Sequence, residues 1–207
     1  MSYRAVFDRS KVASLPNLDA FTKWWGPTPD LQIVTFPLNK GKEIFVFATT
    51  SQNDWLHESW TMPGDVVELR KAYANFHQEA RALLDAADSV TKSALYIREP
   101  LPRWSVGRVT LLGDAAHPML PYLAQGAGMA IEDAESLALW WGREDLNVAQ
   151  RLHRYAESRW QRNARVQLKS RRNADIFHAT GWMRWGRDVG LKWVGARLLD
   201  QPWLFAG

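Results

Sequence analysis

Residues 108–134 read RVTLLGDAAHPMLPYLAQGAGMAIEDA. The apolar run at residues 108–112 predicts a buried β-strand that ends at Gly113, and Asp114 follows directly. Residues 129–141 predict a helix whose apolar face consists of Ala130, Ala134, Leu137, Ala138 and Trp141. In an open α/β sheet, ligands bind beyond the carboxyl ends of the strands. We therefore expect Asp114 to project into a crevice that a ligand can enter.

The segment between Asp114 and the predicted helix has the features of a binding loop. Pro118 and Pro121 stiffen it, and the Gln-Gly-Ala-Gly stretch at residues 125–128 lets backbone amides approach a ligand because glycine has no side chain. The helix N-terminus that follows carries unpaired N–H groups and a partial positive charge. This combination suits a ligand with hydroxyl groups and an electron-rich edge. The alternative is that Asp114 only caps a helix or closes a turn.

Composition limits the possible chemistry. The 207-residue chain is 46% hydrophobic and 23% charged, as is usual for a soluble globular protein. It has no cysteine, which excludes disulfides, thiolate metal sites and cysteine nucleophiles, and its five histidines lack metal-ligand spacing. No signal segment opens the sequence, and no stretch approaches the roughly 18 apolar residues of a membrane span. We expect a cytoplasmic protein without a metal.

The charge is unevenly distributed along the chain. Residues 1–142 carry 13 Lys and Arg against 16 Asp and Glu, whereas residues 143–207 carry 13 against 6. The basic part predicts a long helix with one inward-facing seam, made of Leu152, Tyr155, Arg159, Arg162 and Val166. A basic helix can bind nucleic acid or an anionic membrane. We favour the solvated outer face of a packed helix, because the acidic first part offers an intramolecular counterpart, and expect neither nucleic acid nor a membrane as partner.

The first hundred residues predict a sheet with two helices. Strands are predicted at residues 2–7, 31–37, 43–50 and 93–99, the second and third joined by a turn at residues 39–42. Helices are predicted at residues 66–76 and 78–87. Asp65 and Glu68 have the spacing of a capping box at the start of the first helix. Residues 99–104 form a proline-stiffened connector to the rest of the chain.

Residues 107–134 resemble the Gly-Asp motif of the FAD-dependent aromatic hydroxylases. These are single-component flavoprotein monooxygenases, and they include p-hydroxybenzoate, salicylate and 6-hydroxynicotinate hydroxylases. The resemblance extends to IVTFPLNKGKEIFVF at residues 33–47 and to WLF at residues 203–205. It implies an α+β chain, from parent enzymes that are α/β. Its implied parts are a substrate domain at residues 1–100, the C-terminal part of the FAD-binding domain at residues 101–146, and a C-terminal helical region at residues 147–207.

The resemblance also implies roles for individual residues. FAD is the implied cofactor, and Asp114, together with Gly113, would bind its ribityl chain. Pro121 would lie beside the flavin ring on the substrate side. The amides that would face the N1 and C2 carbonyl edge of the ring are those of Gly126, Ala127 and Gly128.

The implied activity is hydroxylation of a small aromatic substrate of the phenol or hydroxy-acid type. In this family NADH or NADPH reduces the flavin, and O2 adds at C4a to give a hydroperoxide. The terminal oxygen of that hydroperoxide is then transferred to the substrate ring. The site must exclude water. Phe36, Phe45 and Phe47 are candidates for its dry wall, and ordinary core packing is the alternative for each.

The residue that activates the substrate is left open. Tyr122 and Gln125 follow Pro121 closely enough to reach a substrate, and these three residues are the catalytic candidates. Relatives often carry a histidine where this chain has Thr35, which cannot act as a general base near neutral pH. His117 belongs to the motif and is expected to be structural. The other histidines, at positions 57, 77, 153 and 178, are expected on the surface or on helices.

The Gly-x-Gly-x-x-Gly fingerprint that binds the ADP half of FAD is absent from the sequence. We therefore interpret the chain as the C-terminal part of such an enzyme, truncated or split. We expect it to bind FAD weakly or not at all by itself, and to need an N-terminal half as partner for hydroxylase activity. A homodimer is a further expected assembly. Two alternatives are a related flavoprotein, such as a ubiquinone-pathway hydroxylase, an epoxidase or a reductase, and a non-enzymatic interaction module.

Overall fold

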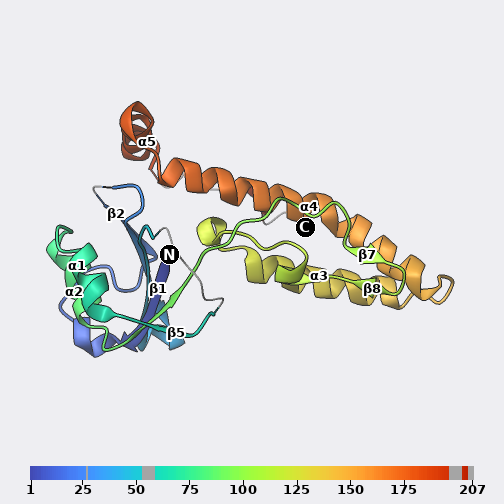
Figure 1. Ribbon diagram of the computed structural model, residues 1–207, viewed down its shortest axis with the longest axis horizontal. Helices are drawn as coiled ribbons and strands as arrows, with labels where there is room; N and C mark the ends of the chain where they lie inside the picture. Colours follow the sequence, from blue (N-terminus) through green and yellow to red (C-terminus); the bar gives the residue numbers. More distant parts are fainter. Residues whose placement is uncertain (27, 53–58, 196–201, 205–207) are drawn as a thin grey trace. The chain divides into compact units, whose positions relative to one another are not determined.

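The computed structural model describes residues 1–26, 28–52, 59–195 and 202–204. The chain divides into two compact units, an N-terminal unit of Met1–Leu95 and a C-terminal unit of Tyr96–Gly207 (Figure 1). Helices and an antiparallel sheet together confirm the predicted α+β class. None of the helices in the described part of the chain is long and apolar enough to cross a membrane.

The N-terminal unit contains one antiparallel sheet with the strand order β2-β3-β4-β1-β6-β5. Its strands are β1 (Ser2–Asp8), β2 (Thr22–Trp25), β3 (Gln32–Leu38), β4 (Glu43–Thr49), β5 (Met62–Gly64) and β6 (Val90–Ser93). The 3-10 turn η2 (Asn39–Gly41) joins β3 to β4, with Lys40 and Gly41 at positive φ. The strands predicted at residues 2–7, 31–37 and 43–50, and the turn between the last two, are confirmed.

Helices α1 (Val66–Ala72) and α2 (Gln78–Asp85) cover one face of this sheet. Alternate residues of the strands point into a common core with the helices, and the most deeply buried are Tyr3, Ile33, Ile44, Ala48, Leu69, Tyr73 and Leu84. The Tyr73 hydroxyl donates to the Gln32 carbonyl oxygen (2.8 Å) and accepts from the Thr49 amide (3.0 Å). This buried hydroxyl therefore anchors the end of α1 to two strands.

Three predictions for the N-terminal unit need correction. Both helices are shorter than predicted, since α1 ends at Ala72 and α2 at Asp85. Asp65 caps α1 by accepting from two amides, but Glu68 binds Lys92 Nζ (3.1 Å), so the capping box is only half formed. The strand predicted at residues 93–99 is wrong, because pairing ends at Ser93. Tyr96 and Ile97 are exposed, so their apolar character does not indicate that they belong to this sheet.

The C-terminal unit is mainly helical. A two-stranded antiparallel ribbon, β7 (Ser105–Val106) and β8 (Val109–Thr110), is followed by the 3-10 turns η3 (Gly113–Ala115) and η4 (Pro121–Leu123). The helices are α3 (Gly126–Trp141), α4 (Val148–Phe177) and α5 (Gly181–Val194), and the 3-10 turn η6 covers Pro202–Leu204. Helix α3 runs alongside α4 (Figure 1).

The strand predicted as buried at residues 108–112 is wrong in extent and burial. Only Val109 and Thr110 form a strand, and Val109 is 68% exposed. One side of the ribbon packs on α4, where Ser105 Oγ donates to the Leu152 carbonyl oxygen (2.9 Å). The other side has no cover among the described residues of this unit, since Val106 is also exposed. An apolar run does not reveal which neighbours cover it.

Helix α3 begins three residues earlier than predicted, so the Gly-Ala-Gly stretch is its first turn. Its predicted inward face is also partly wrong, because Ala134, Ala138 and Trp141 are exposed. The fully buried positions are Met129 and Asp133. The sequence pattern did not predict this buried face of α3, because one of its residues is a carboxylate.

The predicted seam of α4 is confirmed. Asn147 and Gln150 form a capping box at its start, and the seam positions Leu152, Tyr155, Arg159 and Val166 are buried. Arg162 is partly buried beside them. Two arginines of the basic segment therefore face the inside of the unit. Arg154, Arg165 and Arg171 are exposed, as expected for the outer face of a packed helix.

Candidate functional site

Asp114 lies in a tight turn that packs directly on α3. The Ala116 and His117 amides both donate to the Gly113 carbonyl oxygen (2.9 Å each) and close the turn. Gly113 has a φ of +59°, and a Cβ added there would lie 3.3 Å from Ala130 Cβ. Glycine is thus needed here both for its conformation and for the close approach of the turn to α3. Asp114 itself is exposed.

The first turn of α3 lies next to this carboxylate. A Cβ added to Gly126 would lie 3.9 Å from Asp114 Oδ1, and one added to Gly128 would lie 3.5 Å from Gln125 Oε1. Gln125 is the N-cap residue and makes no capping hydrogen bond with its side chain. The amides of Gly126, Ala127 and Gly128 precede the first intrahelical bond, from Met129 N to Gln125 O (2.8 Å). The structure therefore brings Asp114 and Gly126 together, at an open helix end.

Pro121, Tyr122 and Gln125 flank the left-handed residue Ala124 (φ +51°) just before α3. Burial raises the pKa of Tyr122 to about 12. Its hydroxyl lies 3.3 Å from His178 Nε2, and His178 Nδ1 lies 2.7 Å from the Ala174 carbonyl oxygen. A carbonyl oxygen only accepts, so Nδ1 carries the proton and Nε2 accepts from Tyr122. Tyr122 is therefore a hydrogen-bond donor at neutral pH rather than a base.

His178 is a residue that the sequence did not single out for a role. It stands at the C-cap of α4, and the end of this helix holds Tyr122 in three ways. Besides the His178 contact, Asn173 Nδ2 donates to the Tyr122 carbonyl oxygen (3.3 Å), and Phe177 packs edge-on against the Tyr122 ring (5.7 Å). The separation of more than fifty residues left no local signal for this contact.

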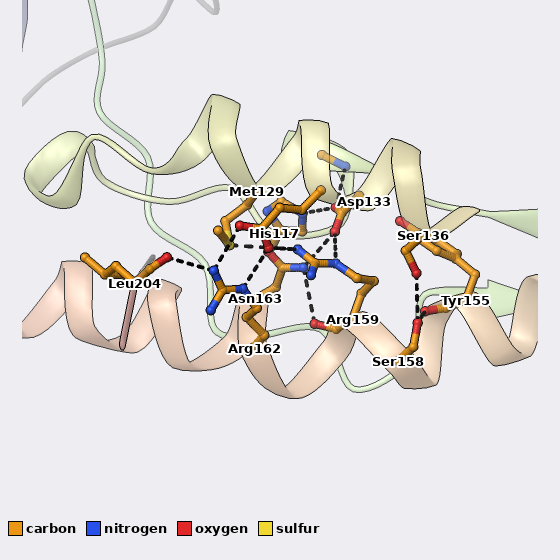
Figure 2. A network of polar contacts seen from close by, with 12 residues as sticks. His117, Met129, Asp133, Ser136, Tyr155, Ser158, Arg159, Arg162, Asn163 and Leu204 are labelled. Carbon is orange, nitrogen blue, oxygen red and sulfur yellow. Dashed lines mark hydrogen bonds and ion pairs between the residues drawn. The ribbon is translucent and has the colours of Figure 1, made fainter. Parts of the chain in front are cut away.

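A buried polar network joins the Asp114 turn to α3 and α4 (Figure 2). Asp133 Oδ2 accepts from His117 Nε2 (2.5 Å) and from the Gly113 amide (3.4 Å). Asp133 Oδ1 accepts from Arg159 Nε (2.8 Å) and Asn163 Nδ2 (2.9 Å). Burial alone would raise the pKa of Asp133, but the hydrogen bonds from His117, Arg159 and Asn163 outweigh it and hold the pKa below its ordinary value. His117 is thus a buried, hydrogen-bonded residue.

In the N-terminal unit, three predicted pocket residues lie on the sheet face opposite α1 and α2. Phe36 and Phe45 are cross-strand neighbours with ring centroids 4.8 Å apart, and Phe47 lies on the same face; all three are partly exposed. They therefore do not belong to the buried core on the other face. Thr35 points the opposite way and is buried.

Arg4 lies on the aromatic face, directly across from Phe47 in the neighbouring strand. It is partly buried, and its Nη2 donates to the Trp60 carbonyl oxygen (2.5 Å) and to Ser93 Oγ (3.2 Å). The guanidinium also lies over the Trp60 ring, 5.2 Å from its centroid. Sequence reasoning did not select this arginine, because its place beside Phe47 depends on the register of two strands that are distant in the chain.

The remaining histidines hold ordinary positions. His77 caps α2, and His153 is exposed beside Glu157, whereas His57 lies outside the described residues. Within residues 1–26, 28–52, 59–195 and 202–204, no group of three His, Asp or Glu side chains could hold a metal ion.

Comparison with known proteins gives consistent matches. Residues 3–169 match the family model of the FAD binding domain. The chain is 39% identical over 188 residues to 6-hydroxynicotinate 3-monooxygenase of Bordetella bronchiseptica, covering 89% of this chain and 46% of that protein. It is 37% identical over 181 residues to 3-hydroxybenzoate 6-hydroxylase 1 of Aquipseudomonas alcaligenes, covering 87% and 45% respectively.

A solved structure of similar fold is a salicylate hydroxylase substrate complex. It has a TM-score of 0.76 and 29% identity, and the match covers 94% of this chain and 53% of that one. Klebsiella pneumoniae HpxO complexed with FAD and uric acid matches with a TM-score of 0.71 and 25% identity, covering 90% and 48%. The chain spans about half the length of the curated relatives it matches.

Proposed function

This chain belongs to the FAD binding domain family, and from that premise we propose that it holds the ribityl and ring portions of FAD in a monooxygenase that hydroxylates a small aromatic acid. The observation that carries the proposal is the Asp114 carboxylate beside the open first turn of α3. On this proposal residues 1–100 form the substrate domain, residues 101–146 the C-terminal part of the FAD-binding domain, and residues 147–207 a helical region that supports it.

The chemistry of the Asp114 site fits the flavin. An exposed carboxylate accepts hydrogen bonds from ribityl hydroxyls, and the free amides of residues 126–128 donate to the electron-rich N1 and C2 carbonyl edge. Once the helix start is ordered around the bound ring, these donors stabilise negative charge on it. Gly126 and Gly128 leave this end of α3 without side chains that would fill the space. Bound FAD, reduced by NADH or NADPH, would supply the activated oxygen from O2.

The aromatic face of the N-terminal unit supports a proposal for the substrate class. Phe36, Phe45 and Phe47 offer partly exposed rings on which a flat ring can stack, and Arg4 beside them offers a positive charge. The names of the relatives include a hydroxynicotinate, a hydroxybenzoate and salicylate, which are aromatic acids. We therefore propose an aromatic hydroxy acid whose carboxylate is attracted by Arg4.

Pro121, Tyr122 and Gln125 are the proposed contacts on the substrate side of the flavin. Because the pKa of Tyr122 is raised and its O–H donates to His178 Nε2, Tyr122 can pass on a proton rather than hold a charge. A substrate hydroxyl that donates to the Tyr122 oxygen would lose its proton as the Tyr122 proton moves to His178. This supplies a base where Thr35 cannot.

Titration of the purified chain with FAD tests the proposal. Amide chemical shifts follow binding, because they report dissociation constants into the millimolar range that we expect for this chain alone. Asp114→Asn should weaken binding by about tenfold, the effect of one charge-assisted hydrogen bond. Hydroxylase activity should appear when an ADP-binding segment from the Bordetella relative is supplied. Equal FAD affinity of the wild type and Asp114→Asn would refute the proposed site.

A further inference from the structure

Asp133 is a completely buried carboxylate with no place in the proposed chemistry of the flavin. It lies two turns along α3 from Gly126, and its side chain is 0% exposed. Burial of a carboxylate is costly unless hydrogen bonds and opposite charge compensate it. An apolar side chain at this position would bury with less cost. The positions of its hydrogen-bond partners indicate the structural role of the carboxylate.

The two oxygens of Asp133 serve two different parts of the unit. Oδ1 accepts from Arg159 and Asn163, which both lie on α4. Oδ2 accepts from the Gly113 amide and from His117 Nε2, which stand on either side of Asp114. Since the carboxylate only accepts, His117 must carry its proton on Nε2. Asp133 therefore ties the turn that bears Asp114 to the pair of helices beneath it.

The adjacent residue Glu132 forms a contrast. Its carboxylate binds Arg162 (2.7 and 2.9 Å) and Arg159 (2.8 Å), so it also ties α3 to α4. Among the described residues, its ion-pair partners Arg159 and Arg162 both lie on α4 and not in the Asp114 turn. Glu132 and Asp133 thus both hold the helices together. Asp133 adds contacts to the turn, and Figure 2 shows the one with His117.

We propose that Asp133, acting through His117 and the Gly113 amide, is a positioning residue that holds Asp114 against the first turn of α3 in the arrangement that receives the flavin. This inference rests on the proposed function for the role of Asp114. It assigns Asp133 no contact with the cofactor. Its effect on flavin binding is exerted through the placement of a neighbouring carboxylate that does make contact.

The first test needs no cofactor. Hydrogen exchange of the amides is compared between Asp133→Asn, which keeps the shape of the side chain, and the matched control Glu132→Gln. The amides of Ala116 and His117, which close the turn, should exchange about tenfold faster in Asp133→Asn than in the control. Faster exchange spread evenly over α3 and α4 in both variants would overturn the proposal, since it would make Asp133 a general helix contact.

The second test is a double-mutant cycle on FAD affinity. Asp133→Asn should weaken FAD binding by about tenfold in the wild-type background, but by less than about threefold in the Asp114→Asn background. Glu132→Gln should change the affinity by less than about twofold. Equal losses in both backgrounds would overturn the proposal. If the wild-type chain bound no FAD even with the ADP-binding segment supplied, the proposed function would fail, and the exchange measurement would still decide whether Asp133 places the turn.

Two substitutions at His117 keep the proposal testable if the Asp133 variant fails to fold. His117→Gln keeps an N–H donor toward Asp133, whereas His117→Phe keeps the ring but loses the donor. We expect His117→Gln to keep exchange at the turn within about threefold of the wild type, and His117→Phe to reproduce the tenfold increase. Identical behaviour of the two variants would contradict a role of Asp133 through His117.

Discussion

The N-terminal unit encloses one continuous apolar core between its sheet and two helices, whereas the C-terminal unit has smaller apolar clusters around buried charged side chains. In the first unit, Ile33 and Ala48 are completely buried among other apolar residues. In the second, the completely buried positions include Asp133 and Asn163. The two units should therefore respond differently to mutation, to acid and to salt.

The largest effect is expected from removing the central charge of the C-terminal unit. Asp133→Ala leaves Arg159 and His117 buried without their shared carboxylate, which should cost about 3–5 kcal/mol of unfolding free energy. Urea denaturation followed by hydrogen exchange would locate the loss in residues 96–195. Asp145→Ala, which removes an exposed partner of Arg143, is the control and should change nothing measurable. A loss of stability spread equally over both units would contradict the proposed difference between them.

A cavity in the apolar core tests the other unit. Ile33→Ala should destabilise the N-terminal unit by about 2–5 kcal/mol, because a fully buried side chain leaves an unfilled space. The loss should stay the same at high salt, since no charge is involved. Val67→Ala, at a position on α1 that is 70% exposed, is the control and should change stability by less than about 0.5 kcal/mol. A strong salt dependence of the Ile33→Ala loss would contradict this account.

Acid should separate the two units. The pKa of Asp133 lies below its ordinary value of 3.8, and the pKa of Glu132 lies below 4.5, chiefly because Arg162 donates to it. At neutral pH both carboxylates stabilise the fold, and this contribution is lost as the pH falls below those ordinary values, where the unfolded chain takes up protons first. Far-ultraviolet circular dichroism between pH 6 and about 2 should show loss of helix before loss of the sheet. Simultaneous loss of helix and sheet would contradict a different acid response of the two units.

The smallest effect on stability, with an opposite effect on binding, is expected at the open end of α3. Gly126→Ala places a methyl group where only ordinary contacts exist, and alanine favours a helix, so stability should rise by up to about 0.5–1 kcal/mol. The same methyl group would obstruct a flavin at this end, and FAD affinity should fall. Gly142→Ala, at the other end of α3, is the control and should leave affinity unchanged. Unchanged FAD affinity in Gly126→Ala would contradict a flavin site at this turn.

Local patterns predicted the elements whose burial depends on their own neighbours in sequence. Strands β3 and β4 and their turn follow from alternation around Asn39 and Gly41, and the seam of α4 follows from its helical spacing. The pairing of Asp114 with the glycine-rich helix start was also predictable, because the two are only twelve residues apart. In each case the signal lies within one stretch of chain.

Contacts between distant segments were not predictable in this way. Asp133 was overlooked because a buried carboxylate breaks the apolar period of α3, and its donors lie on η3 and on α4. His178 reaches Tyr122 across the length of two helices. The exposure of Val109 depends on what covers the ribbon, which its own sequence does not encode. The role of a polar group in a core depends on the partners that it binds, and the fold determines which residues these partners are.

Gln125 stands where helices usually carry a serine, threonine or aspartate that caps the first amides, and its side chain does not cap them here. The start of α3 should therefore fray in the free chain, and a ligand that accepts from these amides would complete the helix in place of a capping side chain. Part of the heat of FAD binding would then come from ordering of the first turn. An aspartate engineered at this position would compete with the cofactor for the same hydrogen bonds, so the more rigid protein would be the poorer receptor.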